Sequence, residues 1–169
     1  MNTITIKENI DILIDKYPYH KSINKKLIDD INKMGYDDAS YYKKNDKAKF
    51  SLTTPSDAAR TINDWVCKLI NIRYDTGNLL SKCFFTRCDK GDFILSHDHG
   101  LSDCFSWVYY VNTPRGSSPL VFTTSNKKIK AEEGQVLIFS SFVKHQVPFN
   151  RCDARISLVG NVIKERKSL

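Results

Sequence analysis

The sequence predicts a mainly β fold with supporting helices, and three observations carry this prediction. The second half of the chain contains several short runs rich in aromatic and β-branched residues, which are typical of strands. The first half contains stretches in which apolar residues recur at helical spacing. The chain of 169 residues, 41% of them hydrophobic, is long enough to bury one sizeable core and suits a single domain.

The first apolar segments predict one strand and one helix. Residues 10–14 are rich in isoleucine and leucine and are expected to form an outer strand. The next apolar residues recur three or four positions apart, which predicts an amphipathic helix that stops at Gly35. They are Ile23, Leu27, Ile31 and Met34. Residues 36–54, rich in Tyr, Asp and Lys, are expected to form a long connection.

A second helix is predicted from its start signals and its apolar stripe. Thr54 is a residue type that caps helices, and Pro55 is favoured in a first helical turn. The stripe comprises Ala58, Ile62, Trp65, Val66, Leu69 and Ile72. Both helices are expected to pack against the larger sheet.

Four apolar runs predict the strands of the β core. These runs cover residues 92–96, 104–112, 135–139 and 155–162. Residues 113–119 and 131–134 are rich in turn-forming types, and each segment predicts a hairpin turn between strands.

Three of the four histidines fall into one constellation. His97 and His99 would project to the same side of a strand, with Asp98 on the other side. His145 follows 46 residues after His99, and Arg155 stands ten residues beyond His145. His145 and Arg155 are expected on neighbouring antiparallel strands joined by a turn at residues 150–153, with both side chains in one cavity.

The motifs around these residues, taken together, resemble a known family. They are Lys90-Gly91-Asp92-Phe93 before the first histidine pair, the runs 106–112 and 134–139, and finally His145, Arg155 and Ser157. In this order and spacing, over roughly residues 80–163, the chain resembles the iron(II)- and 2-oxoglutarate-dependent oxygenases. The resemblance is to a small bacterial and phage-type branch related to prolyl hydroxylases.

The resemblance implies a double-stranded β-helix, a jelly-roll similar to that of the cupins, which holds Fe(II) at its open end. Residues 80–163 would form this core, and residues 1–79 a helical support, within one domain spanning residues 1–169. The implied site residues are His97, His99 and His145 as metal ligands, Arg155 as the anchor of 2-oxoglutarate, and Ser157, Tyr110 and Asn112 as further cosubstrate contacts. No catalytic side chain is expected beyond the metal centre.

His99 occupies a position at which the family carries a carboxylate. A neutral imidazole there leaves the metal centre one unit more positive, but three facial imidazoles still leave positions for a chelating keto acid and for dioxygen. If His99 is not a ligand, Asp103 is the nearest carboxylate that could replace it.

The resemblance implies an oxygenase that uses O2 and 2-oxoglutarate, releases succinate and CO2, and hydroxylates a peptidyl or free amino acid. A nucleic-acid substrate is a further possibility. One alternative is a cupin-type dioxygenase with three histidines that acts without a keto acid and uses Arg155 to bind the carboxylate of its substrate. The other alternative is a non-catalytic β-helix binding module.

The composition indicates which partners, which redox state of the cysteines and which cellular compartment to expect. The net charge of +7 arises from lysines spread over the chain, and a solvated face explains them more simply than a nucleic-acid surface does. The five cysteines lack zinc-ligand spacing and are odd in number, so reduced thiols are expected. No apolar stretch approaches the roughly 20 residues of a membrane span, and we expect a cytoplasmic protein with no membrane partner.

Overall fold

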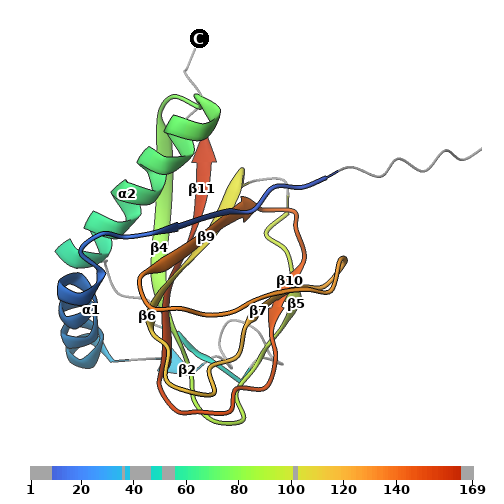
Figure 1. Ribbon diagram of the computed structural model, residues 1–169. Coiled ribbons are helices and arrows are strands. Elements are labelled where there is room, and N and C mark those ends of the chain that lie inside the picture. The colour runs from blue at the N-terminus through green and yellow to red at the C-terminus, as the bar shows by residue number, and fades with distance from the viewer. Residues whose placement is uncertain (1–8, 36, 39–46, 51–55, 101–102, 165–169) are drawn as a thin grey trace, which may run out of the picture.

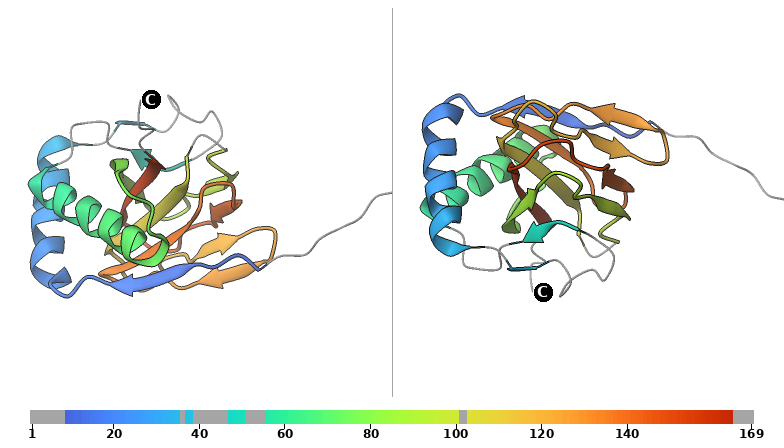
Figure 2. Two further views of the ribbon diagram at one scale, coloured as in Figure 1. Left: turned by 90° about the horizontal axis from the view of Figure 1, so that it is seen from above. Right: turned by 90° about the horizontal axis from the view of Figure 1, so that it is seen from below.

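The computed structural model describes residues 9–35, 37–38, 47–50, 56–100 and 103–164. Within these residues, two antiparallel sheets face each other, and two helices cover the outer face of the larger sheet (Figure 1, Figure 2). The helices are α1 (His20–Met34) and α2 (Asp57–Tyr74). The strands are β1 (Leu13–Lys16), β2 (Asp37–Asp38), β3 (Lys49–Phe50), β4 (Leu79–Cys88), β5 (Ile94–His97), β6 (Phe105–Asn112), β7 (Leu120–Phe122), β8 (Lys127–Ile129), β9 (Gln135–Ser140), β10 (His145–Val147) and β11 (Arg155–Lys164).

The chain passes back and forth between the two sheets. The seven-stranded major sheet has the order β1-β9-β6-β11-β4-β3-β2, and the four-stranded minor sheet has the order β5-β10-β7-β8. Residues 113–119 and 131–134 therefore carry the chain from one sheet to the other and are not hairpin turns as predicted. Turn-forming residues mark a change of chain direction, but they do not say which strand the chain will pair with next.

The helices largely follow the predicted pattern. Helix α1 buries Ile23, Leu27 and Ile31, and it ends before Gly35, whose φ of 78° favours glycine. β1 begins three residues later than the predicted outer strand and pairs with β9. Of the predicted long connection at residues 36–54, the described parts include the short strands β2 and β3, and the rest lies outside the described residues.

Two expectations for the second helix are corrected. Helix α2 starts at Asp57, and Ser56 is its N-cap because the Ser56 hydroxyl accepts a hydrogen bond from Ala59 N–H; Thr54 and Pro55 lie outside the described residues. Ile72 is 74% exposed, and the buried residue of the last turns is Ile70. Two residues turn a helix by roughly 200°, so Ile70 and Ile72 cannot share one face.

Alternation along the strands of the major sheet separates two apolar clusters. One face packs under the helices and includes Tyr109 of β6 and Leu158 of β11. The other face meets the minor sheet and includes Tyr110 of β6, Phe139 of β9 and Leu120 of β7. The second cluster, between the sheets, is the one that adjoins the histidines and Arg155.

Neither helix is long and apolar enough to cross a membrane, among the residues that the structure describes. All five cysteines are unpaired in the structure.

Candidate functional site

His97, His99 and His145 converge in the space between the two sheets. One ring nitrogen of each lies within 4.8 Å of the others. His97 is the last residue of β5 and pairs directly with His145, the first residue of β10, and their ring centroids are 4.4 Å apart. The sequence therefore predicted the convergence of three imidazoles.

His99 reaches the cluster from a loop, because β5 ends at His97. Its backbone N–H donates to the Ser141 carbonyl at 2.9 Å, which fixes the loop against the end of β9. The strict strand alternation expected for this stretch does not continue past His97, and Asp98 also lines the cavity. Asp103, the alternative carboxylate, is not among the lining residues.

Two of the three imidazoles have their orientation and tautomer set by the backbone. The Nδ1 atom of His97 lies 2.8 Å from the Leu95 carbonyl oxygen, and that of His145 lies 2.9 Å from the Val143 carbonyl oxygen. A carbonyl oxygen only accepts, so each Nδ1 must carry the proton and donate it. Each Nε2 then presents an in-plane lone pair, which is the form of imidazole that binds metals.

A cavity of about 430 Å³ connects the histidines to Arg155. Its other walls are mostly apolar and include Phe84, Ile94 and Phe139. Arg155, Ser157 and Val159 line it together, so the shared face predicted for the last strand is present. A mostly apolar cavity lined by both a guanidinium and imidazoles is suited to a small anionic ligand.

Arg155 lines this cavity and is only 1% exposed. Its Nε donates to the Ser118 carbonyl at 3.0 Å, and its Nη1 donates to the Ser157 hydroxyl at 3.3 Å. Its Nη2 is buried without a hydrogen-bond partner in the described residues, and so is the Tyr110 hydroxyl, whose ring centroid lies 5.4 Å from the guanidinium. Buried polar atoms without partners are rare and point to a missing ligand group.

Within the part of the chain that the structure describes, Arg155 forms no ion pair with a carboxylate. Burial raises the pKa of Cys88, the residue paired with Arg155 across β4 and β11, to about 11, even though the Arg155 charge opposes this shift. Burial also raises the pKa of Tyr110. Both groups are therefore neutral at physiological pH, and Arg155 takes part in none of the ion pairs found among the described residues. A buried guanidinium of this kind favours an anionic ligand.

His145 and Arg155 lie on opposite sheets, and this corrects the prediction of neighbouring strands. His145 belongs to β10, which pairs with β5 and β7, whereas Arg155 begins β11, which pairs with β4 and β6. The ten residues from His145 to Arg155 carry the chain from the minor sheet to the major sheet. Both side chains nevertheless face the same cavity, because the two sheets close over it.

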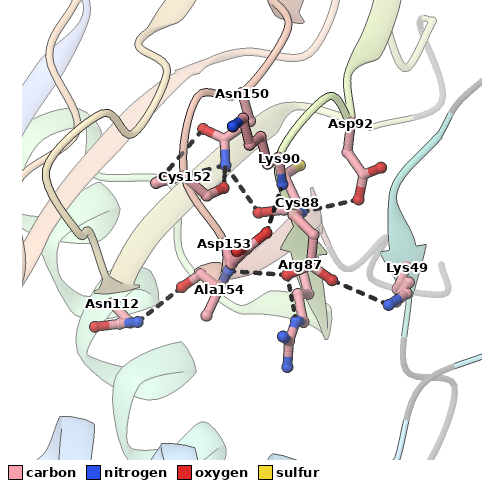
Figure 3. A network of polar contacts seen from close by, with 11 residues as sticks. Lys49, Arg87, Cys88, Lys90, Asp92, Asn112, Asn150, Cys152, Asp153 and Ala154 are labelled. Atoms are coloured by element: carbon pink, nitrogen blue, oxygen red, sulfur yellow. Dashed lines mark hydrogen bonds and ion pairs between the residues drawn. The ribbon is translucent and has the colours of Figure 1, made fainter.

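The backbone just before Arg155 is held from two sides (Figure 3). Ala154 adopts a left-handed φ of 57°, its N–H donates to Asp89 at 2.9 Å, and its carbonyl accepts from Asn112 Nδ2 at 2.7 Å. Asn112, expected as a cosubstrate contact, is not among the cavity-lining residues and acts on the site through Ala154. These bonds hold a backbone conformation that costs energy and set the direction in which Arg155 enters its strand.

A buried asparagine fixes the acceptor of Arg155. Asn150 Nδ2 donates to the Cys88 and Cys152 carbonyls (Figure 3), and its Oδ1 accepts from Ser118 N–H at 2.9 Å. Ser118 in turn accepts from Arg155. Sequence reasoning missed Asn150 and Ser118, because nothing in the local sequence shows which loop will meet the start of β11.

Sequence reasoning also missed Asn161, which lies 3.1 Å from His99. Its spacing was a usable signal, because it is six residues beyond Arg155 and hence on the same face of a regular strand.

Comparison with known proteins shows similarity at the level of structure. No family model matches the sequence, and no curated protein matches it. A prolyl-4-hydroxylase from Pseudomonas putida superimposes with a TM-score of 0.74 at 17% identity, covering 92% of this chain and 93% of that one. A viral collagen prolyl hydroxylase from Paramecium Bursaria Chlorella virus-1, in complex with 2OG, gives 0.70 at 14% identity over 88% and 94% of the two chains.

A third similar structure contains a small-molecule ligand. HygX from Streptomyces hygroscopicus, with nickel, 2-oxoglutarate and hygromycin B bound, gives a TM-score of 0.69 at 9% identity over 89% of this chain and 82% of that one. Another similar structure is described as an oxidoreductase of the 2OG-Fe(II) oxygenase family from Burkholderia pseudomallei. With its two facing antiparallel sheets and two covering helices, the chain has the double-stranded β-helix fold of the prolyl hydroxylases and other 2OG-Fe(II) oxygenases.

Proposed function

We propose that this protein is an Fe(II)- and 2-oxoglutarate-dependent dioxygenase that hydroxylates a peptidyl or free amino acid and releases succinate and CO2. One observation carries the proposal: a buried guanidinium that forms no ion pair among the described residues faces the same cavity as three converging imidazoles. The fold supports it, because the most similar solved structures include 2OG-Fe(II) oxygenases.

The donor set fits iron(II). His97, His99 and His145 would hold the metal through one nitrogen each, and imidazole is a ligand that suits Fe(II). For His97 and His145, the backbone carbonyls already select the tautomer that offers Nε2. With three protein ligands, a bound metal would keep further coordination positions for exogenous ligands.

The other end of the cavity fits the far carboxylate of 2-oxoglutarate. Arg155 has an unused Nη2 donor, and the Tyr110 hydroxyl beside it is also unused within the described residues. A guanidinium binds a carboxylate through parallel hydrogen bonds and keeps its charge at all physiological pH values. Ser157, which accepts from Nη1, would keep the guanidinium plane turned toward the ligand.

In this proposal, the protein binds the metal and the keto acid, orients them and excludes water from the cavity. When bound, the iron and the keto acid supply the oxidative chemistry with O2. Arg155 and Tyr110 would fix one end of the keto acid, so that its other end points toward the histidines. The apolar walls, among them Phe139, Val147 and Val159, exclude water and so strengthen the charge interactions inside the cavity.

The prime substrate is proposed to be a peptidyl or free amino acid. Two of the similar structures are described as prolyl hydroxylases, which supports a peptide. HygX, described with hygromycin B bound, is similar to this chain to nearly the same degree, so free small molecules belong in the substrate screen beside peptides.

The deciding experiment compares two arginine variants. Protein loaded anaerobically with Fe(II) is titrated with 2-oxoglutarate by calorimetry, and succinate is measured after O2 is admitted. We expect Arg155→Ala to lose roughly 100-fold or more in 2-oxoglutarate affinity, because a buried charged hydrogen-bond pair contributes about 3 kcal/mol or more. Arg151→Ala, which removes an exposed arginine four residues earlier, is the matched control and should behave as wild type.

Two results would contradict the proposal. Equal 2-oxoglutarate affinity in Arg155→Ala and wild type would show that Arg155 does not bind the keto acid. A wild-type protein that binds iron through the three histidines but forms no succinate from the keto acid would favour the cupin-type alternative, in which Arg155 holds the carboxylate of a different substrate.

A further inference from the structure

The face of β11 that lines the cavity becomes more exposed toward the end of the strand. Arg155 and Ser157 are buried, Val159 and Asn161 are half-buried, and Ile163 is 38% exposed. Side chains two residues apart share one face of a strand, so Ile163 continues the row that begins at Arg155. This row of side chains therefore leads out of the cavity onto the surface of the protein.

Strand β4, which pairs with β11, shows the same gradient. Thr86 and Phe84 line the cavity, whereas Lys82 and Leu80, the next residues on that face of the strand, are exposed. Leu80 is 51% exposed and pairs directly with Ile163. Cross-strand partners lie side by side on one face of a sheet, so Leu80 and Ile163 form an exposed apolar pair just outside the cavity.

These strand ends are exposed on one face only. On the opposite face, Val162 and Cys83 are buried in the apolar cluster under the helices. Helix α2 packs against both strands, and Figure 1 shows the ends of β4 and β11 next to it. The exposed apolar pair therefore stands on strands that are fixed from behind by a helix, and its exposure is not the fraying of a free strand end.

We propose that the exposed face formed by Leu80, Lys82 and Ile163, named here the β4–β11 platform, docks an extended peptide segment of the prime substrate through an apolar side chain. This inference rests on the proposed function. Continuity with the cavity identifies the occupant, because Asn161 lines the cavity, contacts His99 and precedes Ile163 by two residues. A substrate that reaches both places must extend about 7 Å along the strands, as a peptide does in two residues.

Lys82 adds a charge to the platform. It pairs with Asn161 and so lies between the cavity and the apolar pair. It is exposed and takes part in none of the ion pairs found among the described residues. An ammonium group at this position favours an acidic side chain in the bound segment and disfavours a basic one. The expected segment therefore carries an apolar residue about two positions from the modified one, with an acidic residue close to both.

The first experiment selects binders from a display library of random short peptides. Wild type, Leu80→Ser and Ile163→Ser, each shown to be folded by its Tm, are loaded with Fe(II) and 2-oxoglutarate without O2. The matched control is Ile72→Ser, which removes an apolar residue that is 74% exposed on α2. We expect wild type and the control to select peptides with an apolar residue at a fixed position, and both platform variants to lose this preference. Equal preferences in all four proteins, or no selected motif in wild type, would overturn the proposal.

The second experiment measures the affinity of one selected peptide by fluorescence polarisation. Replacing its apolar residue by Ser should weaken binding to wild type by about 10-fold and should have little further effect on Ile163→Ser. Additive losses would show that this residue of the peptide binds elsewhere. Lys82→Glu should reverse the preference between an acidic and a basic residue in the peptide, and an unchanged preference would contradict the role of Lys82.

Admitting O2 and analysing the peptides by mass spectrometry separates this proposal from the proposed function. Oxidised peptides whose binding does not depend on Leu80 and Ile163 would support the oxygenase and refute the platform. Peptides that bind through these two residues but never gain an oxygen atom would refute the oxygenase, while the peptide-binding surface would stand. Self-association of wild type that Ile163→Ser abolishes and the selected peptide does not compete with would assign the surface to a second copy of the chain and overturn the proposal.

Discussion

A histidine at position 99 gives the cluster three imidazole nitrogens and no carboxylate as its candidate metal donors. His99→Asp places a carboxylate where the resembled family has one, and we expect this variant to retain iron. His99→Ala leaves two nitrogen donors and should bind iron far more weakly. Iron content after equilibrium dialysis against Fe(II) under anaerobic conditions measures both variants; full retention in the Ala variant would show that His99 is not a ligand.

Asp89 links the strands around the arginine through its carboxylate. Burial by itself would raise its pKa, but hydrogen bonds from the Ala154 N–H, Arg87 and Lys49 outweigh burial and lower the pKa from 3.8 to about 2. A lowered folded-state pKa means that Asp89 stabilises the fold above about pH 4 and loses this contribution as the pH falls toward 2.

The pH dependence can be isolated with a single variant. Asp89→Asn should be less stable than wild type at pH 6, and the difference in free energy of unfolding should shrink steadily as the pH falls from about 4 to about 2. Urea denaturation at a series of pH values measures it. A difference that stays constant with pH would mean that the charge of Asp89 contributes nothing.

At the scale of elements, strand β11 contributes residues to both faces of the major sheet. Arg155, Ser157 and Val159 line the cavity, whereas a side chain at Gly160 would point toward Trp107. A Cβ at Gly160 would approach Trp107 Cε2 to 2.6 Å and the Lys82 carbonyl oxygen to 2.7 Å. The Trp107 indole also donates to Ser81, so it is not easily displaced.

Gly160→Ala should therefore destabilise the protein by about 1–3 kcal/mol, as overpacking in a core does. Urea denaturation gives the value. Trp107→Phe removes part of the clashing ring, so the double variant should lose less than the sum of the two single variants. Additive losses would show that Trp107 and Gly160 are not coupled.

The start of β11 gives a second prediction at this scale. Asn112→Ala removes the donor to the Ala154 carbonyl, and Asn112 does not itself line the cavity. We expect a several-fold loss of 2-oxoglutarate affinity with unchanged iron binding, since the buried Arg155 would be less well directed. Calorimetry on the iron-loaded variant tests this, and an unchanged affinity would show that Asp89 alone suffices to hold Ala154.

At the scale of the whole molecule, the proposed ligands would join the two sheets. Iron would sit on residues of the minor sheet and its adjoining loop, whereas the keto acid would reach Arg155 on the major sheet. Binding to the native state alone stabilises it, by about 2.7 kcal/mol at a ligand concentration 100 times Kd. We expect 2-oxoglutarate to raise the Tm of the metal-loaded wild type, and to have little effect on metal-loaded Arg155→Ala. An equal rise in both proteins would place the keto acid elsewhere.

The sequence predicted the parts of the fold that depend on local patterns. Helix α1 and the strands β6, β9 and β11 follow from apolar periodicity, and His97, His99, His145 and Arg155 do face one cavity. The pairing of the strands could not be predicted this way, because nothing local in β10 states that it pairs with β5 and β7 in the minor sheet and not with β11. Asn150 and Ser118 were missed for the same reason, since their roles depend on contacts between distant segments.

The proposed anchors of the metal and of the keto acid lie on opposite sheets, and this has a consequence for selectivity. Because the histidines and Arg155 lie on different sheets, their separation depends on how the two sheets pack, and packed interiors resist compression and stretching. The proposed site would then select keto diacids by their length. Oxaloacetate is one methylene shorter than 2-oxoglutarate and would not reach the arginine, and 2-oxoadipate is one methylene too long.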